Sequence, residues 1–198
     1  MTTIINSRFT RFTHQWILDE QRAFIRSRSI QGVIGVAQEM VLDINRKLVG
    51  SNLVVKQDMD MAYDLIEWNF IIRTMRCMGF SEASFDIFFH CYFSSWFNIM
   101  LVGKQCSYMK SVRGLWQGDP PSLNLIIQAQ DALSIYFSLA MQCGTVRPFH
   151  CDSQVPNVSH LLFADDLLFC VNFQRPSIRC FVLIMDEYTK WSGQVINR

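Results

Sequence analysis

The sequence has little charge, and its cysteines are not spaced as in a cross-linked or zinc-binding protein. Only 18% of the 198 residues are charged, and 18 basic against 17 acidic residues leave a net charge of +1, which predicts no broad basic surface for nucleic acid. The seven cysteines are an odd number without a C-x-x-C pair. We therefore expect reduced thiols, an intracellular location (nucleus or cytoplasm) and no disulfide-linked partner.

Long hydrophobic runs are also missing. The most apolar stretch, 87–102, is interrupted by polar residues and is shorter than the roughly 20 apolar residues of a membrane-spanning helix. The first residues lack the continuous apolar region of a signal peptide. We expect no membrane association. Half of the residues are hydrophobic, which excludes disorder by composition and predicts a single domain, or a fragment of a larger one, with its own core.

Charge is unevenly distributed along the chain. Residues 1–56 contain eight Lys or Arg and four Asp or Glu, whereas residues 57–103 contain two and six. A basic segment followed by an acidic one suits a site that binds phosphate beside a cation-binding cluster. The same distribution equally suits a protein with no such site.

Hydrophobic periodicity and turn residues predict alternating helices and strands. We expect Asp64 and Ser122 to cap two of the helices, and the aromatic residues at 85–97 to lie in the core. The expected elements are helices from 30, over 64–78, about 82–95, 122–143 and 176–192, strands at 53–55 and 194–197, and hairpins at 97–112 and 160–171. Their core order, β-α-β-β-α-β, predicts an α+β fold in which helices back one antiparallel, ferredoxin-like sheet.

Two adjacent carboxylates, Asp165 and Asp166, separate two strongly apolar runs. The simplest structure is a β-hairpin with both residues at its apex. Like charges held side by side in a partly desolvated place are unfavourable unless a cation compensates them, and a divalent cation does so best. An ordinary turn is the alternative, since Asp is common in turns.

Asp58 stands at the end of another expected strand. If the β-α-β-β-α-β order holds, this strand pairs with the hairpin that carries Asp165 and Asp166. Carboxylates from both could then hold two Mg²⁺ ions roughly 3.5–4 Å apart, the arrangement used for phosphoryl or nucleotidyl transfer. Asp60 and Asp64 are competing candidates, although Asp64 is better explained as a helix cap.

A glycine- and proline-rich loop over 113–122 leads into the longest expected helix. Exposed backbone N–H groups at a helix start can receive phosphate or sugar oxygens. Gln117 could hydrogen-bond a base or a template backbone. A turn followed by a capped helix is the alternative.

Three segments together resemble the central palm motifs of plant-type non-LTR (LINE-type) retrotransposon reverse transcriptases: Lys56-Gln-Asp58-Met-Asp-Met-Ala-Tyr63-Asp64, Arg113-Gly-Leu-Trp-Gln117-Gly118-Asp119-Pro120 and Phe163-Ala-Asp165-Asp166. The resemblance extends in order from about residue 18 to 198. It implies a partial fingers segment over 1–52, a palm over 53–198 and no thumb. The activity that it implies is RNA-directed DNA polymerisation.

By this resemblance, Asp58, Asp165 and Asp166 are the catalytic metal ligands. They would hold two Mg²⁺ ions, with Mn²⁺ as a substitute, and Asp166 is expected to contribute less directly than the other two. The implied partners are an RNA template, a DNA primer and a deoxynucleoside triphosphate.

The resemblance also assigns binding roles. Tyr63 matches the aromatic residue that stacks under the incoming sugar and disfavours a 2′-hydroxyl. Gln117 and Gly118 match a loop that contacts nucleotide and template, and Arg28 matches a fingers arginine near the template.

The chain departs from the family pattern in ways that keep two other functions open. Trp116 replaces an arginine of the loop, which removes a charge that Trp cannot supply, and Met61 stands where the family often has lysine. Pro121 and Leu123 also differ from the pattern. A catalytically inactive retrotransposon relic and a non-enzymatic nucleic-acid-binding module are therefore alternatives to an active polymerase.

Overall fold

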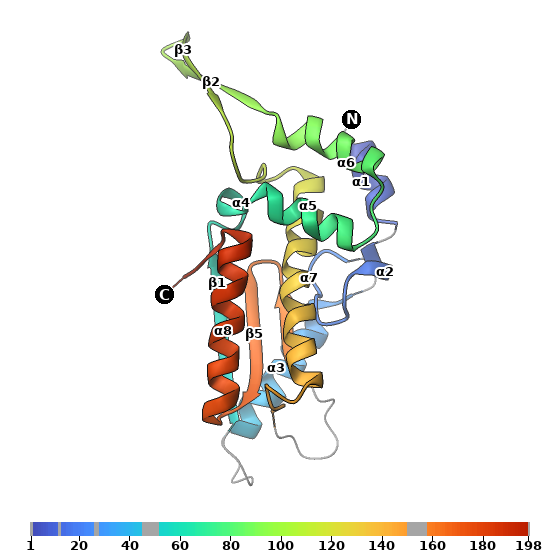
Figure 1. Ribbon diagram of the computed structural model, residues 1–198, viewed down its shortest axis with the longest axis vertical. Helices are drawn as coiled ribbons and strands as arrows, with labels where there is room; N and C mark the ends of the chain where they lie inside the picture. Colours follow the sequence, from blue (N-terminus) through green and yellow to red (C-terminus); the bar gives the residue numbers. More distant parts are fainter. Residues whose placement is uncertain (1, 12, 26–27, 45–51, 150–157, 198) are drawn as a thin grey trace.

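A four-stranded antiparallel sheet forms the centre of the protein. The computed structural model describes residues 2–11, 13–25, 28–44, 52–149 and 158–197 (Figure 1). The strands lie in the order β4-β5-β1-β6, and all neighbours are antiparallel. Their bounds are β1 Asn52–Asp60, β4 His160–Phe163, β5 Asp166–Asn172 and β6 Val195–Ile196. Together with the helices between them, they confirm the predicted α+β fold with a split β-α-β plan.

The two faces of the sheet pack against different helices. Helices α7 (Pro120–Gln142) and α8 (Arg175–Ser192) lie along one face (Figure 1). Alternate residues of β1, including Leu53 and Val55, join the core that these helices form. Val54 instead packs beside Met40 of α3 (Ile30–Ile44) on the other face. Because side chains alternate along a strand, the even-numbered residues of β1 face away from α7 and α8.

A second core lies around the first half of α7. Its buried members include Phe9, Ile71, Phe88, Tyr92 and Leu125. The helices that contribute or surround it are α1 Thr2–Phe9, α2 Thr13–Trp16, α4 Ala62–Leu65, α5 Trp68–Cys77, α6 Glu82–Phe88 and the π-helix η1 Phe89–Phe93. The expected aromatic helix over 82–95 is therefore confirmed, although it ends in a π-helical turn.

The predicted hairpin at 97–112 is present as β2 (Trp96–Leu101) and β3 (Lys104–Lys110), which form a separate two-stranded sheet. It projects from one end of the molecule (Figure 1). Val102 and Gly103 form its turn, and both have positive φ, 50° and 75°, as in the tight turns that suit a twisted hairpin. Trp96 and Phe97 are exposed, which corrects the expectation that all aromatic residues of 85–97 lie in the core.

Both predicted caps are wrong. Asp64 lies inside the short helix α4, and α5 begins after Glu67 without a side-chain cap. Helix α7 begins after Asp119, so Ser122 lies buried within its first turn. Pro120 starts the helix early because its ring fixes φ and it has no N–H to be capped.

In the part of the chain that the structure describes, no helix has both the length and the apolar character needed to cross a bilayer.

Candidate active site

Asp58 and Asp166 lie directly opposite each other on the central strands β1 and β5. The Met59 N–H donates to the Asp165 carbonyl at 3.3 Å. This bond makes Asp58 and Asp166 a non-hydrogen-bonded pair, the type whose Cα atoms lie only about 4.5 Å apart. Both side chains are on the face that turns away from α7 and α8, and the predicted pairing of the Asp58 strand with the second hairpin is confirmed.

Asp165 is in the turn rather than in a strand. Ala164 and Asp165 connect β4 to β5, and Ala164 adopts a left-handed conformation with φ 52°. The Asp165 side chain is exposed, while its carbonyl accepts the bond from Met59. The predicted hairpin apex is therefore present, but its two carboxylates occupy different positions, one in the turn and one at the start of β5.

Lys56 brings a positive charge to this pair. Its Nζ lies 3.0 Å from Oδ1 of Asp166. The hydrogen bond and charge of Asp166 raise the pKa of Lys56 above its ordinary value, and Asp58 and Asp165 add to the rise. Lys56 is two residues before Asp58 and shares its face of β1, so the i, i+2 spacing was a signal that could have placed it in the site.

Asn197 approaches Asp58 from the opposite side. Its backbone N–H donates to the Asp58 carbonyl at 2.9 Å, and its Nδ2 donates to the Asp58 carboxylate at 3.3 Å. Asp58 is thus fixed by β5 on one side and by the residue after β6 on the other.

The competing carboxylates lie elsewhere. Asp60 pairs with Val195 of β6 rather than with β5. Asp64 is exposed on α4 and lines a cavity beside the loop that precedes α7. The structure therefore favours Asp58 over both as the partner of the second hairpin.

The chemistry of the carboxylate pair suits a divalent cation. Among the residues that the structure describes, no three carboxylate, imidazole or thiolate groups converge as metal ligands. Asp58 and Asp166 nevertheless supply adjacent hard oxygen ligands, which Mg²⁺ prefers, and the Lys56 ammonium already lies against Asp166. The available donor set is two aligned carboxylates, Asp58 and Asp166, with Asp165 on the neighbouring turn.

Tyr63 lies close to this cluster. Met61, with φ 44°, turns the chain from β1 into α4, which carries Tyr63. Burial raises the pKa of the Tyr63 hydroxyl, and the charge of Asp165 adds to this rise. The residue is partly buried.

The loop before α7 is fastened to α4. Gly114 N–H donates to the Ile66 carbonyl at 2.8 Å, and Leu115 N–H donates to the Tyr63 carbonyl at 2.7 Å. The indole Nε1 of Trp68 donates to the Gly114 carbonyl at 2.7 Å. A Cβ on Gly114, whose φ is 86°, would lie 2.7 Å from the Asp64 carbonyl oxygen. Only glycine permits this close contact, which couples the loop to the backbone of Tyr63.

Gln117 and Gly118 are exposed on the same loop. Gln117 and Trp116 line a cavity of about 340 Å³ together with Phe97, Arg113 and Asp64. The Trp116 ring centroid lies 6.0 Å from that of Phe97 and 6.4 Å from that of Tyr92. Trp116 therefore packs the loop against the base of the β2–β3 hairpin.

The cavity beside the candidate residues is smaller than another cavity of the protein. A larger, mainly apolar cavity of about 650 Å³ lies between α1 and the segment from Gly79 to Phe88, and none of the candidate residues lines it.

Arg28 fixes the N-terminal segment. Its guanidinium donates to the carbonyls of Ile17, Leu18 and Gln21 and to the Asp19 carboxylate. The same segment is tied to β4, where Arg22 N–H donates to the Leu162 carbonyl at 3.0 Å. These bonds hold the Arg28 side chain, only 10% of which is exposed, against residues of its own segment. Its role near a template stays a prediction.

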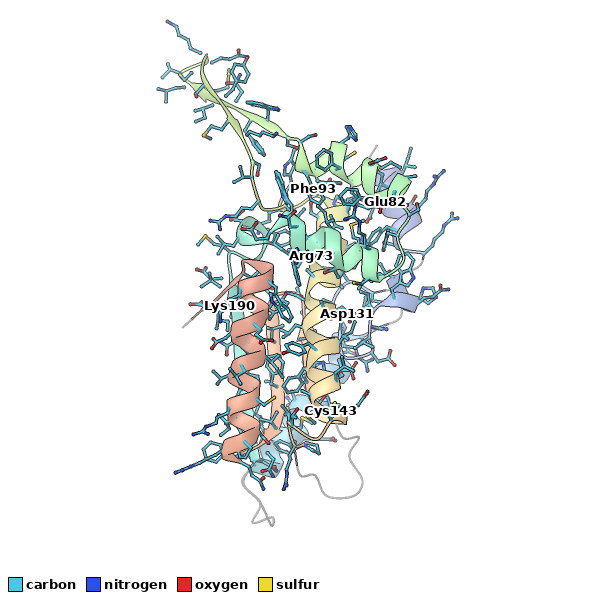
Figure 2. All side chains as sticks on the ribbon, in the orientation of Figure 1. Arg73, Glu82, Phe93, Asp131, Cys143 and Lys190 are labelled. Atoms are coloured by element: carbon cyan, nitrogen blue, oxygen red, sulfur yellow. The ribbon has the colours of Figure 1, made fainter. Side chains whose placement is uncertain are left out.

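Asp131 anchors this segment to α7. The Leu18 N–H donates to its Oδ1 at 2.9 Å, and Figure 2 shows Asp131 on the side of α7 that faces the N-terminal part of the chain. Sequence reasoning missed this residue because the contact joins positions far apart in the chain.

Comparisons with known proteins bear on the family and on the fold of this chain. The family model "Reverse transcriptase (RNA-dependent DNA polymerase)" matches residues 1–198. An apo telomerase from Candida tropicalis, truncated from its C-terminal domain, has a similar structure with a TM-score of 0.59 and 13% identity, covering 98% of this chain and 38% of that chain. A telomerase from Candida albicans in complex with a TWJ fragment of telomeric RNA has a TM-score of 0.53 and 11% identity, covering 98% of this chain and 32% of that one.

At such identities the structural likeness concerns the fold alone, and this chain spans about a third of the length of the telomerase chains. The family match, in contrast, covers the whole sequence. It agrees with the α+β architecture of the chain. The chain belongs to the reverse transcriptase (RNA-dependent DNA polymerase) family.

Proposed function

We propose that this chain is the palm, with part of the fingers, of an RNA-directed DNA polymerase of the non-LTR, LINE type. In this proposal residues 53–198 form the palm and residues 1–52 the partial fingers. The observation that carries it is the cross-strand pair Asp58–Asp166, next to the Asp165 turn and to a loop fastened onto Tyr63. The partners are an RNA template, a DNA primer and a deoxynucleoside triphosphate.

Asp58, Asp165 and Asp166 would together hold two Mg²⁺ or Mn²⁺ ions. When bound, the metals supply Lewis acidity toward the primer 3′-hydroxyl and neutralise charge on the leaving pyrophosphate. The sheet aligns the two carboxylates before substrate arrives, since β5 and the residue after β6 fix Asp58 from both sides. Such preorganisation lowers the cost of reaching the reactive geometry.

Tyr63 would support the sugar of the incoming nucleotide and disfavour a 2′-hydroxyl. Gln117 and Gly118 would contact the nucleotide and the template. Because Leu115 N–H is bonded to the Tyr63 carbonyl, these two elements would keep a fixed spacing.

Primer extension on an RNA template, with Mg²⁺ and separately with Mn²⁺, tests the proposal. We expect Asp58→Asn and Asp165→Ala/Asp166→Ala to abolish extension. The matched control is Asp86→Asn, an exposed aspartate of α6 outside the candidate site, which should keep it. Extension by the Asp58→Asn variant at the wild-type rate would overturn the assignment.

A non-enzymatic nucleic-acid-binding module is the second candidate, and Trp116 and Lys56 favour it. The family's loop arginine is absent, and the carboxylate pair is already neutralised in part by a lysine. This function predicts salt-dependent RNA binding that survives Asp165→Asn, without extension by the folded wild-type chain.

A further inference from the structure

The β2–β3 hairpin combines exposed aromatic rings with positive charge. The segment 87–118 contains three Lys or Arg residues and no Asp or Glu. Trp96 and Tyr108 keep 65% and 66% of their surface exposed. Exposed rings on a projecting hairpin are unusual for a monomer surface and mark a contact site.

Strand register places the rings and a lysine on one face. Trp96 pairs with Lys110, and Asn98 pairs with Tyr108 on the next rung of the same face. The Lys110 Nζ lies 6.0 Å from the centre of the Trp96 ring. Diagonal neighbours on such a face are roughly 7–8 Å apart, so Trp96 and Tyr108 form successive platforms with a cation beside them.

The opposite face joins the hairpin to the candidate active site. Phe97 pairs with Met109 there, and its ring packs against Trp116 of the loop that carries Gln117. Figure 2 shows the side chains at the far end of the hairpin extending away from the body of the molecule. A strand of nucleic acid in contact with Gln117 could therefore continue along the hairpin.

We propose that the face formed by Trp96, Tyr108 and Lys110 binds single-stranded RNA. Bases would stack on the two rings, and Lys110 would contact phosphate. Stacking of this kind tolerates any sequence, because every base has a π-face, and cations supply the salt-dependent part of the affinity. The absence of acidic residues from 87–118 favours a polyanion over a protein partner. This inference rests on the proposed function, which requires an RNA template.

Fluorescence anisotropy with a labelled oligo(U) RNA tests the inference on the full chain. We expect Trp96→Ala/Tyr108→Ala to weaken binding at least about tenfold. Lys110→Gln should reduce the slope of log affinity against log salt by roughly 0.7. The matched control, Ile99→Ala/Met109→Ala, changes the opposite face and should leave RNA affinity unchanged. All four side chains are exposed, and circular dichroism melting curves should coincide with that of the wild type.

Parallel primer extension separates this inference from the proposed function. Asp58→Asn should lose extension and keep RNA affinity, whereas Trp96→Ala/Tyr108→Ala should raise the template concentration needed for extension. If the wild type extends primers and the aromatic variant binds RNA normally, the inference is wrong and the function stands. If Ile99→Ala/Met109→Ala instead abolishes self-association seen by light scattering, and RNA affinity depends on neither variant, the hairpin is a protein contact and the inference is also wrong.

Discussion

The Nζ of Lys56 and the Oδ1 of Asp166 lie 3.0 Å apart, so the chain itself places a cation on the carboxylate pair that we assign to metal binding. Both side chains are largely exposed, 72% and 53%. Solvent screens such a pair, and the lysine can leave without breaking packed structure. A divalent ion therefore competes with Lys56 for Asp166.

Replacement of Lys56 by Met should tighten metal binding. The competing ammonium is removed while the length of the side chain is retained, so we expect the dissociation constant for Mn²⁺ to fall roughly two- to fivefold. The electron paramagnetic resonance signal of free Mn²⁺ measures it directly. Lys104→Met, an exposed lysine of the hairpin, is the matched control and should change nothing. Equal or weaker Mn²⁺ binding by Lys56→Met would show that the lysine does not compete.

Gly114→Ala should be far more damaging than Gly118→Ala. Both glycines have positive φ, 86° and 88°, but only at Gly114 would a Cβ meet backbone, 2.7 Å from the Asp64 carbonyl oxygen. We expect Gly114→Ala to lower the free energy of unfolding by about 2–4 kcal/mol and Gly118→Ala by about 1 kcal/mol. Urea denaturation measures both. Similar losses for the two variants would mean that the loop is not held against α4.

Stability should depend on pH through Asp131. Burial raises the pKa of this carboxyl to about 7, whereas it is about 3.9 in an unfolded chain. Between these values the folded protein binds a proton that the unfolded chain has lost, so this group makes stability fall as pH rises from about 4 to about 7. Asp131→Asn keeps an acceptor for the Leu18 N–H and removes the charge. We expect it to raise the unfolding free energy at pH 8 by on the order of 2 kcal/mol.

Protonation of His160 should change the stability of the protein with pH in the opposite direction. Burial lowers the pKa of its imidazole to about 4, and the hydroxyls of Ser134 and Ser159 lie at its two ring nitrogens. The unfolded chain takes up a proton near pH 6.5 that the folded protein does not, so this group makes stability rise between about pH 4 and 6.5 and stay constant above.

The two slopes oppose each other in the wild type between about pH 4 and 6.5. Chemical denaturation across this range should therefore show stability rising with pH in Asp131→Asn and falling with pH in His160→Gln. Parallel curves for the two variants would contradict one of the two shifted pKa values.

Local pattern was sufficient to predict the pairing that builds the candidate site. The apolar runs on both sides of Asp165 and Asp166 predict a hairpin, and the strand order predicts its contact with Asp58, because each depends on residues near in sequence or on a common topology. The β2–β3 hairpin and the start of α3 were also predicted. At the start of α3, the Ser29 hydroxyl accepts from the Gln31 N–H, as a helix cap does.

What depends on distant contacts was missed. Asp64 and Ser122 have cap-like spacing, but the helices begin elsewhere because the loop at Gly114 docks on α4 and Pro120 starts α7 early. The i, i+2 spacing of Lys56 and Asp58 places both on one face of β1, but the ion pair of Lys56 with Asp166 depends on the register between β1 and β5. The exposure of Trp96 could not be predicted, since nothing in a run of aromatic residues shows which of them leave the core.

The register between β1 and β5 links chemistry to packing. The pairing that puts Asp58 against Asp166 is the same one that puts Val55 against Phe169 in the core beneath α7 and α8. A slip of one residue would turn Leu53 and Val55 away from α7 and α8, so the core enforces the alignment of the carboxylates. In evolutionary terms, the carboxylates can be replaced one by one without loss of the frame that aligns them, and a descendant with altered carboxylates inherits a ready-made position for two side chains of another chemistry.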